Sequence, residues 1–139
     1  MRRAALVLGG VLVSTPALAQ QSAVSCEVAD FSMTLRLHLP IAAGPYGSPS
    51  GQPMQGSLEI HHQKVPREQR VWSLDGKVPA QFWNQGGELK MLLILGTGED
   101  AITLVINTAQ RQGESNYTGA FRLNAAGVRL TGKLACVVG

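Results

Sequence analysis

The sequence predicts an all-β protein: an antiparallel meander of about eight strands that forms a small barrel or sandwich, preceded by a cleaved signal peptide. Three observations predict this class. Short segments of alternating apolar and polar residues recur at fairly even spacing, glycine-rich turns separate them, and helical periodicity is missing beyond the first residues. Residues 20–139 are therefore expected to form a single domain.

The first 19 residues have the pattern of a secretory signal peptide. The segment begins with Arg2 and Arg3, continues with a short apolar run at residues 4–13, and ends with the small-residue sequence Ala17-Leu18-Ala19. The apolar run is shorter than the roughly 20 residues that span a bilayer. We expect cleavage after Ala19, no membrane span in the mature chain, and a periplasmic or secreted location.

The charge balance argues against a nucleic-acid partner. The chain carries 12 Lys and Arg against 9 Asp and Glu, a net charge of +3. Loss of Arg2 and Arg3 with the signal peptide leaves 10 basic residues against the same 9 acidic ones, a net charge of +1. The mature chain also has no run of basic residues of the kind that contacts a phosphate backbone.

The two cysteines, Cys26 and Cys136, are predicted to form a disulfide. They lie near opposite ends of the exported part and do not form a Cys-x-x-Cys redox motif. In an oxidising compartment such an isolated pair is typical of a structural bridge. It would join the first strand to the last, whether those strands are neighbours in a barrel or face each other across a sandwich.

The first strand is expected at residues 26–39. Its apolar phase slips by one residue near Ala29 and Asp30, which predicts a bulge or break that keeps Phe31 in the core. Residues 40–56 alternate prolines with glycines and are expected to form a long irregular loop. Such a loop is either a flap over a binding site or a tolerated surface insertion.

The middle of the chain supplies the next strands. Residues 57–63 alternate, and residues 71–74 and 77–82 flank Asp75-Gly76, a strong hairpin signal. Pro79 limits the second arm to an edge or irregular position. Residues 88–95 are apolar on both faces, so we place them centrally and paired on both sides, with residues 101–108 as one partner.

The last strands form the clearest hairpin. Residues 116–124 and 128–138 both alternate, with Cys136 on the apolar side. The link between them ends in Gly127 and suits a type I turn closed by a left-handed glycine.

Four aromatic residues are the candidates for a ligand site. Tyr46 is the one aromatic residue of loop 40–56, and Trp72, Phe82 and Trp83 are expected at one end of the core. A pocket between the loop and this aromatic group is the predicted site, although aromatic clusters also serve simply as packing.

A metal site has weaker support. Glu59 and His61 share a strand face, and His38 is on a polar face of another strand, so the three could contribute ligands. The three residues are explained equally well as ordinary polar side chains on the solvent-exposed face of an antiparallel sheet. The sequence contains no nucleophile elbow and no His-Glu-x-x-His helix.

From these patterns we expect an exported, non-enzymatic β-domain that binds a small molecule or an envelope protein and needs no cofactor. The alternative is a structural or accessory subunit that docks through a sheet edge or through loop 40–56. A metal-dependent hydrolase is a third, less favoured reading.

Overall fold

The computed structural model describes residue 10, residues 22–42 and residues 48–139. The rest of the expected signal peptide and Tyr46 lie outside this part of the chain. Within it the protein is all-β, with two short 3-10 turns, η1 (Arg67–Gln69) and η2 (Gly98–Asp100). The strands are β1 (Ser22–Ala29), β2 (Met33–Ile41), β3 (Gln55–Ile60), β4 (Val71–Ser73), β5 (Gln81–Gln85), β6 (Glu88–Leu95), β7 (Ile102–Gln110), β8 (Asn116–Ala125) and β9 (Val128–Val138).

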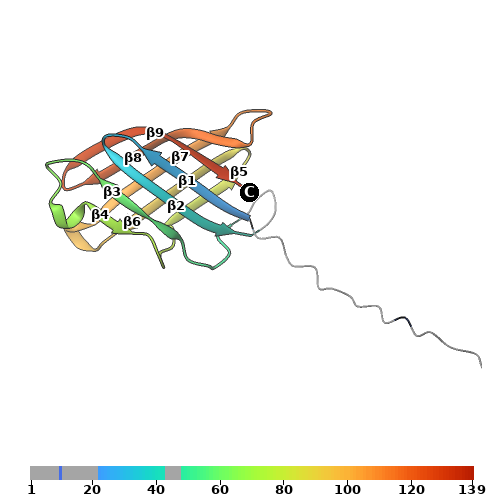
Figure 1. Cartoon of the computed structure of the whole chain (residues 1–139), viewed down its shortest axis with the longest axis horizontal. Helices are drawn as coiled ribbons and strands as arrows, with labels where there is room; N and C mark the ends of the chain where they lie inside the picture. Colours follow the sequence, from blue (N-terminus) through green and yellow to red (C-terminus); the bar gives the residue numbers. More distant parts are fainter. Residues whose placement is uncertain (1–9, 11–21, 43–47) are drawn as a thin grey trace, which may run out of the picture.

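All nine strands belong to a single antiparallel sheet that curls into a half-barrel (Figure 1). The strand order is β4-β3-β2-β1-β9-β8-β7-β6-β5. Consecutive strands are neighbours everywhere except between β4 and β5, and β1 is hydrogen-bonded to β9. The expected meander is confirmed, and the described chain forms one curled sheet rather than a two-sheet sandwich.

The two ends of the sheet, β4 and β5, are not hydrogen-bonded to each other, and we call this opening the seam. It has a simple geometric cause. Directions alternate along an antiparallel sheet, so its first and ninth strands run the same way, and pairing them would require a parallel ladder. Parallel neighbours need a crossover of about a dozen residues or more. Only residues 74–80 separate β4 from β5.

Side chains close part of this seam instead of backbone hydrogen bonds. Trp72 on β4 packs over Gly96, where a β-carbon would lie only 3.0 Å from Trp72 Cη2. The Trp72 indole N–H donates to the Gln69 carbonyl at 2.7 Å, and the Gln69 side chain donates to Asp100 Oδ1 at 3.3 Å. The turn after β6 is thereby tied to the segment before β4.

The expected first strand is in fact two strands. The predicted break at Ala29–Asp30 is present, but it is a turn that reverses the chain, so β1 and β2 form a hairpin. Phe31 lies at the tip of this turn and is 94% exposed. The prediction that it packs in the core was wrong, because the residue after the phase slip belongs to the turn and not to the next strand.

The Asp75-Gly76 turn forms, but its predicted hairpin does not. The Lys77 N–H donates to the Leu74 carbonyl at 3.1 Å, and Gly76 has a positive φ. The chain beyond the turn does not return along β4. Residues 81–85 pair with β6 instead, so the turn leads the chain across the seam.

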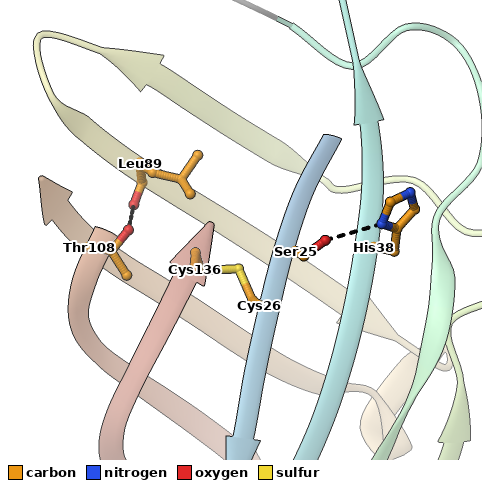
Figure 2. Close-up of a disulfide and its surroundings, with 6 residues drawn as sticks. All are labelled: Ser25, Cys26, His38, Leu89, Thr108 and Cys136. Carbon is orange, nitrogen blue, oxygen red and sulfur yellow. Dashed lines mark hydrogen bonds between the residues drawn. A yellow bond between two sulfur atoms is a disulfide. The ribbon is translucent and has the colours of Figure 1, made fainter. Parts of the chain in front are cut away.

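The interior is filled by side chains from all parts of the sheet. Alternate residues of the long strands are buried in one apolar cluster, which contains Met33, Leu35, Leu89, Leu104 and Phe121 among its members. Thr108 is the one buried polar residue of the described chain, and its hydroxyl donates to the Leu89 carbonyl at 2.9 Å (Figure 2). The central placement of residues 88–95 is confirmed, since β6 pairs with both β5 and β7.

The predicted disulfide between Cys26 and Cys136 is confirmed. The two cysteines are directly opposite each other in the β1–β9 ladder, with their Cα atoms 4.1 Å apart (Figure 2). Both are fully buried. The bridge therefore joins neighbouring strands and fixes the register at which the two ends of the chain meet.

The turn between β8 and β9 differs from the expected one. Ala125 pairs with Val128, so the link has two residues, Ala126 and Gly127, and both have positive φ values, 50° and 74°. Two-residue links of this kind match the twist of the strands. The sequence expectation placed a left-handed residue only at Gly127, because alanine rarely adopts that conformation.

Replacing Ala126 by glycine or asparagine is expected to raise the free energy of unfolding by up to about 1 kcal/mol. The left-handed conformation costs a residue with a β-carbon about 1–2 kcal/mol. Glycine avoids this cost, although the greater freedom of its unfolded chain offsets part of the gain. Asparagine adopts the conformation more readily than alanine because its short side chain can hydrogen-bond locally. Urea unfolding of Ala126→Gly, Ala126→Asn and the unaltered chain would measure the change. Loss of stability in both variants would contradict this turn geometry.

Candidate functional site

The outer face of β5, β6 and β7 carries a groove with a volume of about 590 Å³. This size is within the range of about 300–1,000 Å³ that is typical of small-molecule sites. Each strand contributes consecutive residues to its lining, and six of the side chains face outward. These are Gln81 and Trp83 from β5, Lys90 and Leu92 from β6, and Val105 and Asn107 from β7.

Sheet register arranges these six side chains in two rows. Trp83 lies opposite Lys90, and Lys90 lies opposite Asn107. The neighbouring row, two residues along each strand, is Gln81, Leu92 and Val105. Because residues two apart share a face and are about 7 Å apart, the groove has an aromatic wall, a partly buried aliphatic floor and amides at two of its corners.

The charges beside Trp83 cancel each other. Lys90 Nζ lies 3.5 Å from Glu88 Oε2, and both side chains are about half exposed. An exposed ion pair of this kind adds little to stability. Its local effect is to leave the groove without a net charge, so the site has no strong field for an ionic ligand.

Two of the predicted ligand residues, Phe82 and Trp83, line this groove. They are adjacent on β5 and therefore point to opposite faces. Trp83 is directed outward and is 49% exposed, whereas Phe82 packs against the core. The expectation that they form one aromatic cluster does not describe their arrangement: Phe82 supports the strand and Trp83 is presented to solvent.

The other predicted ligand residues are not part of the groove. Trp72 packs against the core and over Gly96, across the seam. Tyr46 lies outside the described residues. Of loop 40–56, Pro40 and Ile41 belong to β2, and Ile41 pairs with Pro49. The described part of the loop borders a separate hollow of about 410 Å³ beside the chain end at Gly139.

The structure separates His38 from the other two weak metal candidates, Glu59 and His61. His61 Nδ1 is 3.8 Å from Glu59 Oε1, and its Nε2 is 2.9 Å from Thr34 Oγ1. His38 is four residues from Thr34 on β2, about 13 Å along the strand, and its Nδ1 lies 3.1 Å from Ser25 Oγ (Figure 2). Within the described chain, no three His, Cys, Asp or Glu side chains gather as metal ligands would.

Asp30 holds the turn between β1 and β2. Its Oδ1 accepts hydrogen bonds from the Ser32 hydroxyl at 2.7 Å and from the Ser32 and Met33 N–H groups, each at 2.8 Å. Desolvation by itself raises the pKa of Asp30. The hydrogen bonds, together with the nearby His61, outweigh this effect, so the pKa lies below its ordinary value.

Asp30→Asn is expected to destabilise the protein at neutral pH and to have little further effect in strong acid. A carboxylate with a lowered pKa contributes stability above the unfolded-state pKa of about 3.9, and this contribution disappears as the pH falls through the folded-state pKa. Urea unfolding between pH 2 and pH 7 should therefore show the variant and the unaltered chain converging below about pH 4. Glu99→Gln, in an exposed turn, is the matched control, and a constant Asp30→Asn difference at every pH would contradict the expectation.

Sequence reasoning missed most of the groove. Residues 88–95 have apolar side chains on both faces, and this pattern predicts only a central strand. Leu92 and Ile94 face outward in β6, so the same pattern also marks an apolar surface patch. Gln81, Lys90 and Asn107 carry no motif of their own, and only the strand register brings them beside Trp83.

No family model matches this chain, and no curated protein or solved structure is significantly similar to it. Among the described residues, no helix has the length and hydropathy needed to cross a membrane. A function must therefore be inferred from the chemistry of the groove itself.

Proposed function

We propose that this chain is an exported, non-enzymatic β-domain that binds a small molecule in the groove over β5, β6 and β7. The observation that carries the proposal is Trp83, a half-exposed indole beside hydrogen-bonding side chains in a hollow of about 590 Å³. A tryptophan at such a place loses the benefit of burial unless something covers it. A bound ligand would supply that cover.

The packed interior leaves no room for a ligand inside the sheet, so a small-molecule site has to lie on the outer surface. Large side chains such as Phe121, Met33 and Leu35 fill the curled sheet and are fully buried. Lipocalin-like barrels hold ligands inside the sheet, and here that space is occupied by the core. The buried disulfide between Cys26 and Cys136 is compatible with an oxidising, extracytoplasmic compartment.

Ligand binding can be tested through the two indole N–H groups of the protein. We would record ¹H–¹⁵N spectra of the purified chain with a library of neutral, anionic and cationic small molecules. The Trp72 N–H is bonded to the Gln69 carbonyl, so it serves as an internal reference, and Trp83→Phe assigns the two signals. A ligand in the groove should shift the Trp83 signal alone, and a library without any such ligand would contradict the proposal.

A second candidate function is docking on an envelope protein through a sheet edge. The observation that favours it is topological: β4 and β5 end the sheet and do not pair with each other. An added strand from a partner is a common use of such an edge. An added strand on β4 would broaden the backbone signals of that strand, which lies outside the groove, whereas a small molecule would move only signals around the groove.

A further inference from the structure

We propose that the ligand of the groove is a neutral saccharide, with one sugar ring stacked on the indole of Trp83. The inference rests on the proposed small-molecule function and specifies its chemical class. Its basis is a combination of three features in one place. These are a half-exposed indole, amide side chains on the same face of the sheet, and a local charge that sums to zero.

The first feature selects a ligand with a flat face of C–H groups. The π face of an indole carries partial negative charge, and the C–H groups on one face of a pyranose ring carry partial positive charge. The aliphatic side chains of Leu92 and Val105 lie in the neighbouring row. They continue the apolar surface away from Trp83, so a second ring could follow the first along the groove.

The second feature selects a ligand with many hydroxyl groups. Gln81 shares the outward face with Trp83, about 7 Å along β5, and Asn107 lies two strands across, about 10 Å away. Each carboxamide offers both a donor and an acceptor, and each sugar hydroxyl also offers both. An apolar ligand would leave these amides without partners, which costs affinity.

The third feature selects against charged ligands. Lys90 is the cation nearest to Trp83 in the register, and Glu88 lies 3.5 Å from its ammonium group. A phosphorylated or carboxylated ligand would have to compete with Glu88 for Lys90 and would meet repulsion from the carboxylate. A neutral hydroxyl can instead share both groups, accepting from Lys90 and donating to Glu88.

The test is calorimetric titration of the full chain with a panel of tetrasaccharides. Cellotetraose, maltotetraose, laminaritetraose and chitotetraose are the neutral probes, and tetragalacturonate is a probe of the same length that carries carboxylates. We expect at least one neutral probe to bind and tetragalacturonate to bind at least about tenfold more weakly. Equal binding of tetragalacturonate, or no binding of any neutral probe, would overturn the inference.

Variants connect the binding to the groove. Trp83→Ala should weaken it about tenfold, Trp83→Phe should retain part of it, and Asn107→Ala should weaken it about two- to tenfold. Phe31→Ala is the matched control, because Phe31 is an exposed aromatic residue at the distant β1–β2 turn. A neutral saccharide that binds the three groove variants with the affinity of the unaltered chain would also overturn the inference.

The outcomes separate this inference from the proposed function. If a charged or apolar molecule shifts the Trp83 indole signal while the neutral tetrasaccharides do not bind, the binding function stands and the saccharide assignment fails. If no probe of any class shifts that signal, both fail together.

Discussion

Replacing both Cys26 and Cys136 by alanine is expected to lower the free energy of unfolding by about 2–5 kcal/mol. The bridge closes a loop with a sequence separation of 110 residues, so its loss frees almost the entire unfolded chain. In the folded state it holds β1 against β9, the contact that joins the first strand in the chain to the last one. Equilibrium urea unfolding of the variant and of the unaltered chain would measure the difference.

A reductant separates the two parts of this effect. Both cysteine side chains are fully buried, so alanine also removes packing contacts. Reduction of the unaltered chain breaks the covalent link and leaves the sulfur atoms in place. We expect the reduced chain to lie between the oxidised chain and the double variant in stability, and the variant to be insensitive to reductant. An unaltered chain whose stability does not respond to full reduction would contradict the structural role of the bridge.

Truncating Phe121 to alanine is expected to cost about 3–5 kcal/mol of unfolding free energy. The Phe121 ring is fully buried and lies directly across the β8–β9 ladder from Gly132. A β-carbon at Gly132 would be 2.7 Å from Phe121 Cε1. The ring therefore fills the space that a side chain on β9 would otherwise occupy.

The same contact predicts a compensating pair. Gly132→Val alone should cost about 1–3 kcal/mol or more through the clash with the ring and through a 3.0 Å approach of its β-carbon to Asp30 Oδ2. In the double variant Phe121→Ala, Gly132→Val, the valine enters the vacated space, so the total loss should fall short of the sum by about 0.5–3 kcal/mol. Phe121→Ala combined with Ala126→Gly, at the β8–β9 turn, is the additive control. Additivity of the first pair would mean that the register of β8 and β9 is different.

Several local elements of this fold could be predicted because they depend on short-range patterns. Strict alternation identified the hairpin at residues 116–138, and apolar residues on both faces identified β6 as a strand with two neighbours. The break near Ala29 was visible as a phase slip. The sequence did not show whether this break is a bulge or a tight turn, because both shift the apolar phase in the same way. Only the pairing of β1 with β2 distinguishes them.

The candidate site was harder to predict than the strands. The sequence predicts Trp83 as a ligand residue but groups it with Trp72 and Phe82, which the structure places against the core. Asn107 and Lys90 become its neighbours only through the pairing of β5, β6 and β7. A single sequence contains no local signal that separates registers two residues apart, since such a shift keeps every side chain on the same face of the sheet.

By itself, the sequence determined the all-β class and the pairing of its two cysteines, because alternation and composition act over a few residues and only one intramolecular bridge was possible. The tertiary structure decided that β1 pairs with β9, that the sheet stays open between β4 and β5, and that Trp83 faces a groove. These features depend on strand direction, crossover length and register. All three are set by contacts between residues far apart in the chain, which no short segment can specify.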